Sequence, residues 1–367
     1  MQSPVVHPKT VKLAIPSGEA EPSLYRSRYG GLWVDRRDAH DILETRLAKG
    51  EVTDADAEAL GHYIDHGYVV FPKATDESVI DEYLALFEAA WDDPPDRCML
   101  QWNYQSLPMD RKFYDEVAKV GSLHMWFDRA GELLFPPPVL RFLSQVYERP
   151  PVAFQTLTMR KGSEDLLHID TAPLTLTEPM SLAGSWVALE DVQPLSGEFQ
   201  FIPGSHRLPE QLHYGTEKSH HGDFEEAYKI LMATRRMCEE RGLETKNFMA
   251  KKGDVLIWHG DLMHGGAPIQ DSTRTRKSLV VHLMPLGVMP TTFNSSGFSA
   301  VPYAQGGYTL NALWDDLISN PPPWPPSSAA LRDKTRPIDL WREWVPLELR
   351  KQIPPSFGAW VREHLSR

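Results

Sequence analysis

The sequence predicts a mainly β fold with flanking helices, in which the strands form a jelly roll. After Val152, short apolar or alternating runs recur between turn residues, which is the pattern of strands. These runs cover residues 153–160, 182–189, 198–202, 255–258 and 277–284. Long crossing connections join them, and many short strands connected in this way are typical of a jelly roll. Before Val152, two segments have the apolar spacing of helices.

The two helical segments are defined by their apolar spacing and by their ends. The first begins after Thr53, a favourable N-cap, keeps helical spacing through Ile64 and ends at Gly67. The apolar run 68–71 that follows is expected to be a buried strand. The second helix covers about 77–91 and has one apolar face, so we expect it to pack behind a sheet.

The chain of 367 residues is expected to form one domain with an extension at each end, because no linker divides it. Residues 1–50 form an N-terminal extension and residues 51–300 the domain. Insertions at about 92–138, irregular and aromatic, and at 208–250, partly helical, are expected to form walls of a pocket. The aromatic residues of the first insertion could equally be core packing. Residues 301–367 form an extension rich in proline and tryptophan, which covers either the core or a second subunit in a homodimer.

The net charge, the apolar runs and the cysteines argue against a nucleic-acid-binding protein, a membrane protein and a protein built on disulfides or zinc. The formal net charge of −12 argues against general nucleic-acid binding, because proteins that contact phosphates normally carry a basic field. No apolar run is long enough to span a bilayer and no signal-peptide pattern begins the chain, so we expect no membrane association and a cytoplasmic location. The two cysteines, Cys98 and Cys238, match neither a disulfide framework nor a zinc motif.

The sequence His168-Ile169-Asp170 is the first chemical signal. On a strand, residues two apart point to the same face, so His168 and Asp170 would present an imidazole and a carboxylate together. Two imidazoles and one carboxylate hold non-haem Fe(II) and leave positions open for reactants. Taken alone, the pair more often forms only a hydrogen bond at a strand end. Adjacent His220 and His221 are poor chelators of one ion, because neighbouring side chains diverge.

Several segments between about residues 50 and 290 resemble, in the same order, the phytanoyl-CoA dioxygenase family of Fe(II)/2-oxoglutarate oxygenases. The segments are 53–71, His168-Ile169-Asp170, 185–191, 196–207 and 253–260 leading to His264, with Arg276 beyond. The resemblance implies a double-stranded β-helix, the cupin-like form of the jelly roll. It also implies Fe(II) as the metal, 2-oxoglutarate as cosubstrate and O₂ as oxidant.

The same resemblance implies roles for individual residues. His168, Asp170 and His264 are expected to ligate iron; His259 is a rival ligand, but the family pattern places the ligand in the later His-Gly unit. Arg276 is expected to pair with the distal carboxylate of 2-oxoglutarate, because a guanidinium offers two parallel hydrogen bonds. Arg274, two residues earlier, is the alternative anchor.

Other positions near these motifs have less defined roles. Trp186 occupies the family's tryptophan position and lies either beside the cosubstrate or in the core. Gln155 and Lys161 are on the strand that leads to His168 and are expected to contact cosubstrate or substrate. His282 is expected to be a hydrogen-bonded neighbour of the site or a core residue. Gly266 stands where the family often has a serine that reaches the cosubstrate.

The resemblance implies a dioxygenase that hydroxylates a small or medium-sized metabolite and releases succinate and CO₂. Asp170 favours hydroxylation, because related halogenases replace this carboxylate with glycine or alanine. The alternatives are desaturation, epimerisation or ring closure at the same site, an iron enzyme that does not use 2-oxoglutarate, and a binding protein without turnover. The family's name does not make an acyl-CoA the substrate, and the sequence shows no convincing cluster of basic residues for its phosphates.

Overall fold

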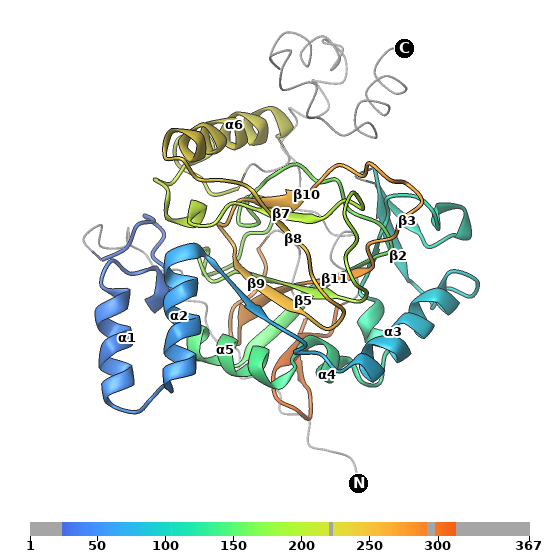
Figure 1. Cartoon of the computed structure of the whole chain (residues 1–367), viewed down its shortest axis with the longest axis horizontal. Helices are drawn as coiled ribbons and strands as arrows, with labels where there is room; N and C mark the ends of the chain where they lie inside the picture. Colours follow the sequence, from blue (N-terminus) through green and yellow to red (C-terminus); the bar gives the residue numbers. More distant parts are fainter. Residues whose placement is uncertain (1–23, 104, 220–222, 292–297, 313–367) are drawn as a thin grey trace.

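Two β-sheets pack face to face in the computed structural model, which describes residues 24–103, 105–219, 223–291 and 298–312 (Figure 1). The larger sheet has ten strands and the smaller has three. Aromatic and aliphatic side chains from both sheets fill the space between them. The fold is therefore the double-stranded β-helix, and the predicted fold class is confirmed.

The strand order explains how distant segments meet. The larger sheet runs β1 (Tyr68–Phe71), β9 (Val255–His259), β6 (Ala183–Ala188), β11 (Ser278–Pro285), β5 (Pro151–Met159), β4 (Lys119–Gly121), β2 (Met99–Trp102) and β3 (Gln105–Pro108). β13 (Tyr308–Leu310) pairs in parallel with β5 and antiparallel with β12 (Ala300–Pro302). The smaller sheet is antiparallel, in the order β10 (His264–Gly266), β7 (Phe199–Phe201) and β8 (Lys246–Phe248).

The two faces of the larger sheet have different partners. Along β6, Trp186 and Ala188 point between the sheets, whereas Val187 belongs to the cluster on the helical side. β11 pairs with β6 on one side and with β5 on the other, so it lies in the centre of the sheet. The inner face of these central strands is where side chains for a site can converge.

Helices cover the outer face of the larger sheet. α2 (Asp54–His66), α3 (Glu77–Ala90), α4 (Ala130–Leu134) and α5 (Pro137–Tyr147) lie along it, and α1 (Ala39–Ala48) packs on α2 (Figure 1). α6 (Phe224–Glu240) lies on the side of the smaller sheet. Short 3-10 turns occur at Trp33–Asp35, Arg111–Phe113, Leu123–Trp126 and Ser205–Arg207.

The predicted ends of the first long helix are confirmed. Thr53 is the N-cap of α2: its hydroxyl accepts the Asp56 N–H, and the Asp56 carboxylate accepts the Thr53 N–H. Gly67 ends the helix with φ 75°, in the left-handed region that glycine adopts without steric cost. A Cβ at Gly67 would lie 2.5 Å from Nδ1 of His206, so the turn also needs glycine for close packing.

The prediction of irregular structure for 92–138 is wrong. This segment contributes β2, β3 and β4, and β4 continues the larger sheet by pairing Lys119 with Met159 and Gly121 with Leu157. These strands have only three or four residues, too few to give a recognisable alternation of apolar side chains. Their place in the sheet is set by β4, which pairs with the edge of β5, and β2 and β3 follow in that order.

The sheet also continues past residue 300, where the sequence suggested that the domain ends, because β13 pairs with β5. The proline- and tryptophan-rich remainder, 313–367, lies outside the described residues, as do residues 1–23 and the pair His220-His221. Within the described ranges, no helix combines the length and the apolar composition needed to cross a bilayer.

Candidate metal centre

Three side chains from separate loops and strands meet at the edge of the smaller sheet. The ligand atoms of His168, Asp170 and His264 lie within 4.8 Å of one another. Nε2 of His168 is 3.6 Å from Oδ1 of Asp170, and Nε2 of His264 is 3.5 Å from the same oxygen. In the described part of the chain, this is the only group of three such side chains that could hold a metal ion.

The backbone brings the two histidines together. His168 donates its N–H to the carbonyl of His264 at 2.8 Å, and His264 donates to the carbonyl of His168 at 2.9 Å. Asp170 is held by its own N–H, which donates to the carbonyl of Gly260 at 2.8 Å. The strand expected at His168-Ile169-Asp170 is therefore reduced to a single antiparallel bridge, and this bridge places both imidazoles side by side.

Two glycines permit this close approach. A Cβ at Gly265 would lie 2.6 Å from the carbonyl oxygen of Asp165, and a Cβ at Gly266 would lie 2.7 Å from both the backbone nitrogen of Glu164 and the hydroxyl of Ser163. The segment before His168 fills the space that a side chain at position 266 would need. The absence of the expected serine at this position therefore follows from packing.

Hydrogen bonds fix the protonation of both imidazole rings. Nδ1 of His168 lies 2.7 Å from the carbonyl oxygen of Leu166, and Nδ1 of His264 lies 2.9 Å from that of Leu262. A carbonyl oxygen only accepts, so each Nδ1 carries the proton and each Nε2 keeps its lone pair. Both lone pairs are therefore free to bind a metal on the side of Asp170.

Asp170 is oriented by a tryptophan. The indole N–H of Trp258 donates to Oδ2 of Asp170 at 2.9 Å, which leaves Oδ1 facing the two Nε2 atoms. Gly184 makes room for this indole, since a Cβ there would lie 2.0 Å from the ring. Burial opposes the charge of Asp170, but His264 and His282 outweigh it and hold the pKa of this carboxyl well below its ordinary value.

Gln155 and His282 form a second layer behind the carboxylate. Nε2 of His282 is 3.6 Å from Oδ2 of Asp170, and its Nδ1 is 2.6 Å from Oε1 of Gln155. The two residues are opposite each other in the β11–β5 register. His282 is thus a buried neighbour of the site, and Gln155 reaches the site through it.

Arg276 is a buried cation on the same inner face. Its residue is only 1% exposed, and its Nε has no hydrogen-bond partner among the described residues. Burial lowers the pKa of Arg276 to about 10, although Asp165, Glu198 and Glu190 oppose this shift. No ion pair of its guanidinium with a carboxylate is found within the described ranges. A buried charge without a paired partner is costly, so this group is suited to an anionic ligand.

Successive aromatic contacts connect Arg276 to one of the metal ligands. The Arg276 guanidinium lies 5.4 Å from the centroid of Trp186. The centroid of Trp186 is 6.1 Å from that of Phe199, and Phe199 stacks on His264 at 5.6 Å and 27°. Trp186 is therefore a core residue beside Arg276, and its expected contact with the cosubstrate stays a prediction.

The other candidate cations belong to surface structure. Lys161 donates to the carbonyl of Ser272 at 2.8 Å, in the turn before β11, rather than to the triad. This position does not support the expected contact of Lys161 with cosubstrate. Arg274 pairs with Asp271 at 2.7 Å, donates to the carbonyl of Pro194 at 2.6 Å, and its side chain is 38% exposed. Of the two arginines, only Arg276 is buried and has a guanidinium without an ion pair among the described residues.

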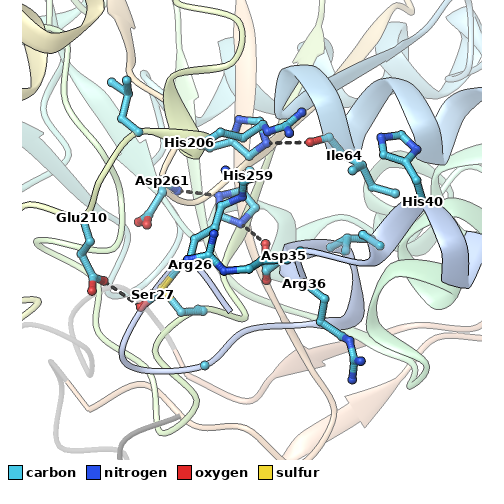
Figure 2. Close-up of a pocket in the computed structure, with 17 residues that line it drawn as sticks. Arg26, Ser27, Asp35, Arg36, His40, Ile64, His206, Glu210, His259 and Asp261 are labelled. Carbon is cyan, nitrogen blue, oxygen red and sulfur yellow. Dashed lines mark hydrogen bonds and ion pairs between the residues drawn. The ribbon is translucent and has the colours of Figure 1, made fainter. Parts of the chain in front are cut away.

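The rival ligand His259 is occupied elsewhere (Figure 2). Its Nε2 lies 2.9 Å from a carboxylate oxygen of Asp35, and its Nδ1 accepts the Asp261 N–H at 3.0 Å. A ring whose Nδ1 accepts a backbone N–H must carry its proton on Nε2, so neither nitrogen has a lone pair left for a metal. This arrangement agrees with the choice of His264.

Three comparisons place these features among known proteins. The family model described as Phytanoyl-CoA dioxygenase (PhyH) matches residues 63–278. The Phytanoyl-CoA dioxygenase domain-containing protein 1 homolog of Caenorhabditis elegans is 22% identical over 171 residues, which are 45% of this chain and 58% of that protein. Phytanoyl-CoA dioxygenase 1 of Oryza sativa subsp. japonica is 30% identical over 131 residues, 34% of this chain and 41% of that protein. The chain thus spans about half the length of the curated relatives it matches.

Solved structures give a more distant similarity. The carbocyclase SnoK, described as non-heme and alpha ketoglutarate dependent, has 19% identity and a TM-score of 0.49, covering 66% of this chain and 87% of that chain. EctD from S. alaskensis, solved with 2-oxoglutarate and 5-hydroxyectoine, has 15% identity and a TM-score of 0.47, covering 64% and 77%. Because these TM-scores are below 0.5, neither reaction nor substrate transfers to this chain.

The hydrogen bond from Trp258 to Asp170 gives a testable prediction. Trp258→Phe keeps an aromatic ring but removes the donor to Oδ2, so the affinity for a divalent metal, measured by titration with Co²⁺, should fall about 10- to 100-fold. Trp186→Phe is the matched control, because the Trp186 indole N–H is buried without a partner among the described residues. Equal affinities for the two variants would contradict the role of the Trp258 donor.

Proposed function

The chain belongs to the phytanoyl-CoA dioxygenase family, and from that premise we propose that it is an Fe(II)- and 2-oxoglutarate-dependent dioxygenase that hydroxylates a small or medium-sized metabolite. The observation that carries the proposal is the combination of the His168, Asp170 and His264 donor set with the unpaired, buried Arg276. The donor set suits a metal ion, and the cation suits a carboxylate. Neither group is required by the fold alone.

The donor set fits Fe(II) on chemical grounds. Two neutral imidazole nitrogens and one carboxylate oxygen form the facial triad of non-haem Fe(II) oxygenases, which leaves three positions open. When bound, Fe(II) with 2-oxoglutarate and O₂ supplies oxidation of a substrate C–H bond, with release of succinate and CO₂. The protein's part is to hold Nε2 of His168, Nε2 of His264 and Oδ1 of Asp170 in fixed directions.

Arg276 would supply the anchor for the cosubstrate. Its planar guanidinium can form two parallel hydrogen bonds with the distal carboxylate of 2-oxoglutarate, and this contact would also offset the cost of the buried charge. The rings of Trp186 and Phe199, both buried, would form the apolar wall along the cosubstrate and exclude water from it. Gln155 and His282 would support Asp170 from behind.

Hydroxylation is favoured over halogenation because the Asp170 carboxylate fills the third protein position of the donor set. Desaturation, epimerisation and ring closure use the same donor set and remain alternatives that depend on the substrate. An iron enzyme that does not use 2-oxoglutarate would have no need for Arg276 as a buried and uncommitted cation. A binding protein without turnover would need neither Arg276 nor the matched histidine tautomers.

The proposal is tested by adding Fe(II) and then 2-oxoglutarate to the metal-free protein without oxygen. A weak visible charge-transfer band should appear only when both are present, and admission of air should release succinate, with higher yield when a metabolite from a panel is the substrate. His264→Ala should lose both signals, since it removes one nitrogen ligand. Full iron occupancy with neither band nor succinate would refute the proposal in favour of an enzyme that does not use 2-oxoglutarate.

The two arginines before β11 give a paired prediction. Arg276→Ala should weaken 2-oxoglutarate binding at saturating metal by a hundredfold or more, because losing a buried charge-assisted pair costs about 3 to 5 kcal/mol. Arg274→Ala should weaken it less than tenfold, because trimming an exposed arginine costs under about 1 kcal/mol. A larger loss for Arg274→Ala would show that the anchor has been assigned to the wrong residue.

A further inference from the structure

A basic groove lies at the surface beside residues 25–37. Its hollow has a volume of about 480 Å³, and five arginines from three separate segments line it: Arg26, Arg28, Arg37, Arg207 and Arg241. Among the residues that the structure describes, one carboxylate, that of Glu210, lines the same hollow, and no lysine does. In a chain with a formal net charge of −12, this is a local reversal of charge.

Within the described ranges, the carboxylates of Glu210 and Asp65 lie at this cluster and do not pair with Arg26 or Arg37. Glu210 accepts hydrogen bonds from the Ser27 hydroxyl at 2.7 Å and pairs with the buried Lys218 at 3.0 Å, so its charge balances another cation. Asp65 pairs with Arg207 at 2.7 Å and offsets one of the five. Arg241 lies at the C-terminal end of α6, where the helix dipole favours a positive charge.

Arg26 and Arg37 are the uncompensated members. Neither side chain has a hydrogen bond or an ion pair within the described ranges. Burial, followed by the positive charges of Arg207 and Arg37, lowers the pKa of Arg26. Asp35 opposes this lowering of the Arg26 pKa. The Asp35 carboxylate, however, is hydrogen-bonded to His259, as Figure 2 shows in its view of the adjoining cavity. The cluster therefore has an excess of positive charge that an anion would relieve.

The backbone that carries the arginines is held in place. Arg37 donates its N–H to the carbonyl of Leu24 at 2.9 Å, and Tyr25 and Arg36 form an antiparallel bridge. Arg28 donates its N–H to Glu210 at 3.2 Å. These contacts fix the loop that presents Arg26, so an incoming ligand would not have to order it.

From these features we propose that the groove binds a small molecule that bears phosphate groups. A guanidinium matches phosphate oxygens with two parallel charge-assisted hydrogen bonds, and it stays charged at any physiological pH. A phosphate concentrates more negative charge than a carboxylate, which suits several arginines around one hollow. The volume falls within the range of small-molecule sites, roughly 300 to 1,000 Å³, so it accommodates more than a single phosphate ion.

Calorimetric titration of the metal-free protein tests this proposal independently of the iron site. Inorganic pyrophosphate and ADP are the probes, at constant ionic strength because screening weakens such contacts. The wild-type protein should bind both, and R26Q/R37Q should bind each at least tenfold more weakly. R111Q/R235Q is the control with the same change of net charge outside the groove, and it should bind as the wild-type protein does. Tighter binding of ADP than of pyrophosphate assigns an organic ligand, and the reverse assigns an inorganic one.

Thermal unfolding provides a second readout, and it also shows whether the variant is folded. Without phosphate, R26Q/R37Q should be at least as stable as the wild-type protein, because the substitutions remove repulsion between the positive charges of the arginines. With pyrophosphate, only the wild-type protein and the control variant should gain stability. The proposal is overturned if millimolar pyrophosphate and ADP do not bind the wild-type protein. It is equally overturned if both double variants lose the same affinity, or if an acidic peptide such as poly-glutamate binds as tightly as ADP.

Discussion

The reciprocal backbone pair between His168 and His264 is the constraint on which the site depends. Two hydrogen bonds, of 2.8 and 2.9 Å, join a loop to the smaller sheet and set the imidazole centroids 4.5 Å apart. The pair forms only because Gly265 and Gly266 let the loop before His168 approach. Each imidazole then donates its Nδ1 proton to a carbonyl two residues earlier in the chain, so the same backbone geometry that joins the segments also directs both Nε2 lone pairs.

Asp170 completes the set because several contacts hold the segment that carries it. Its N–H bonds to Gly260, its Oδ2 accepts from Trp258, and the Thr171 hydroxyl that follows donates to Asp261. Asp261 is itself balanced by the buried Lys218 at 2.8 Å. The indole N–H holds one oxygen of the carboxylate and leaves the other oxygen for a metal. Residues behind metal ligands commonly orient them by such hydrogen bonds.

The sequence predicted the parts of the fold whose signals are local. The ends of α2 at Thr53 and Gly67 and the central strands β5, β6, β9 and β11 have long or well-capped patterns, and they lie where expected. The short strands β2 to β4 and β12 to β13 were missed because pairing, rather than their own pattern, holds them in the sheet. β4 and β13 pair with β5, and β2, β3 and β12 are added to the sheet through them.

The residues of the site likewise differ in whether the sequence could predict them. His168, Asp170, His264 and Arg276 could be named from motifs, whereas Trp258 looks like a core strand residue until the structure brings its indole to Asp170. The choice of Arg276 rather than Arg274 as the anchor rests on the burial of Arg276. The sequence could not give this, because residues two apart on a strand point to the same face. The arginine groove was invisible for another reason: its five members come from segments about two hundred residues apart, and the overall charge is negative.

The most direct test of the account is a crystal structure of the protein grown with Fe(II) without oxygen, with anomalous diffraction measured on both sides of the iron absorption edge. The account predicts one strong anomalous peak in contact with Nε2 of His168, Oδ1 of Asp170 and Nε2 of His264, with the indole of Trp258 still bonded to Oδ2. A peak at His259, or none within reach of the three side chains at full iron occupancy in solution, would contradict it.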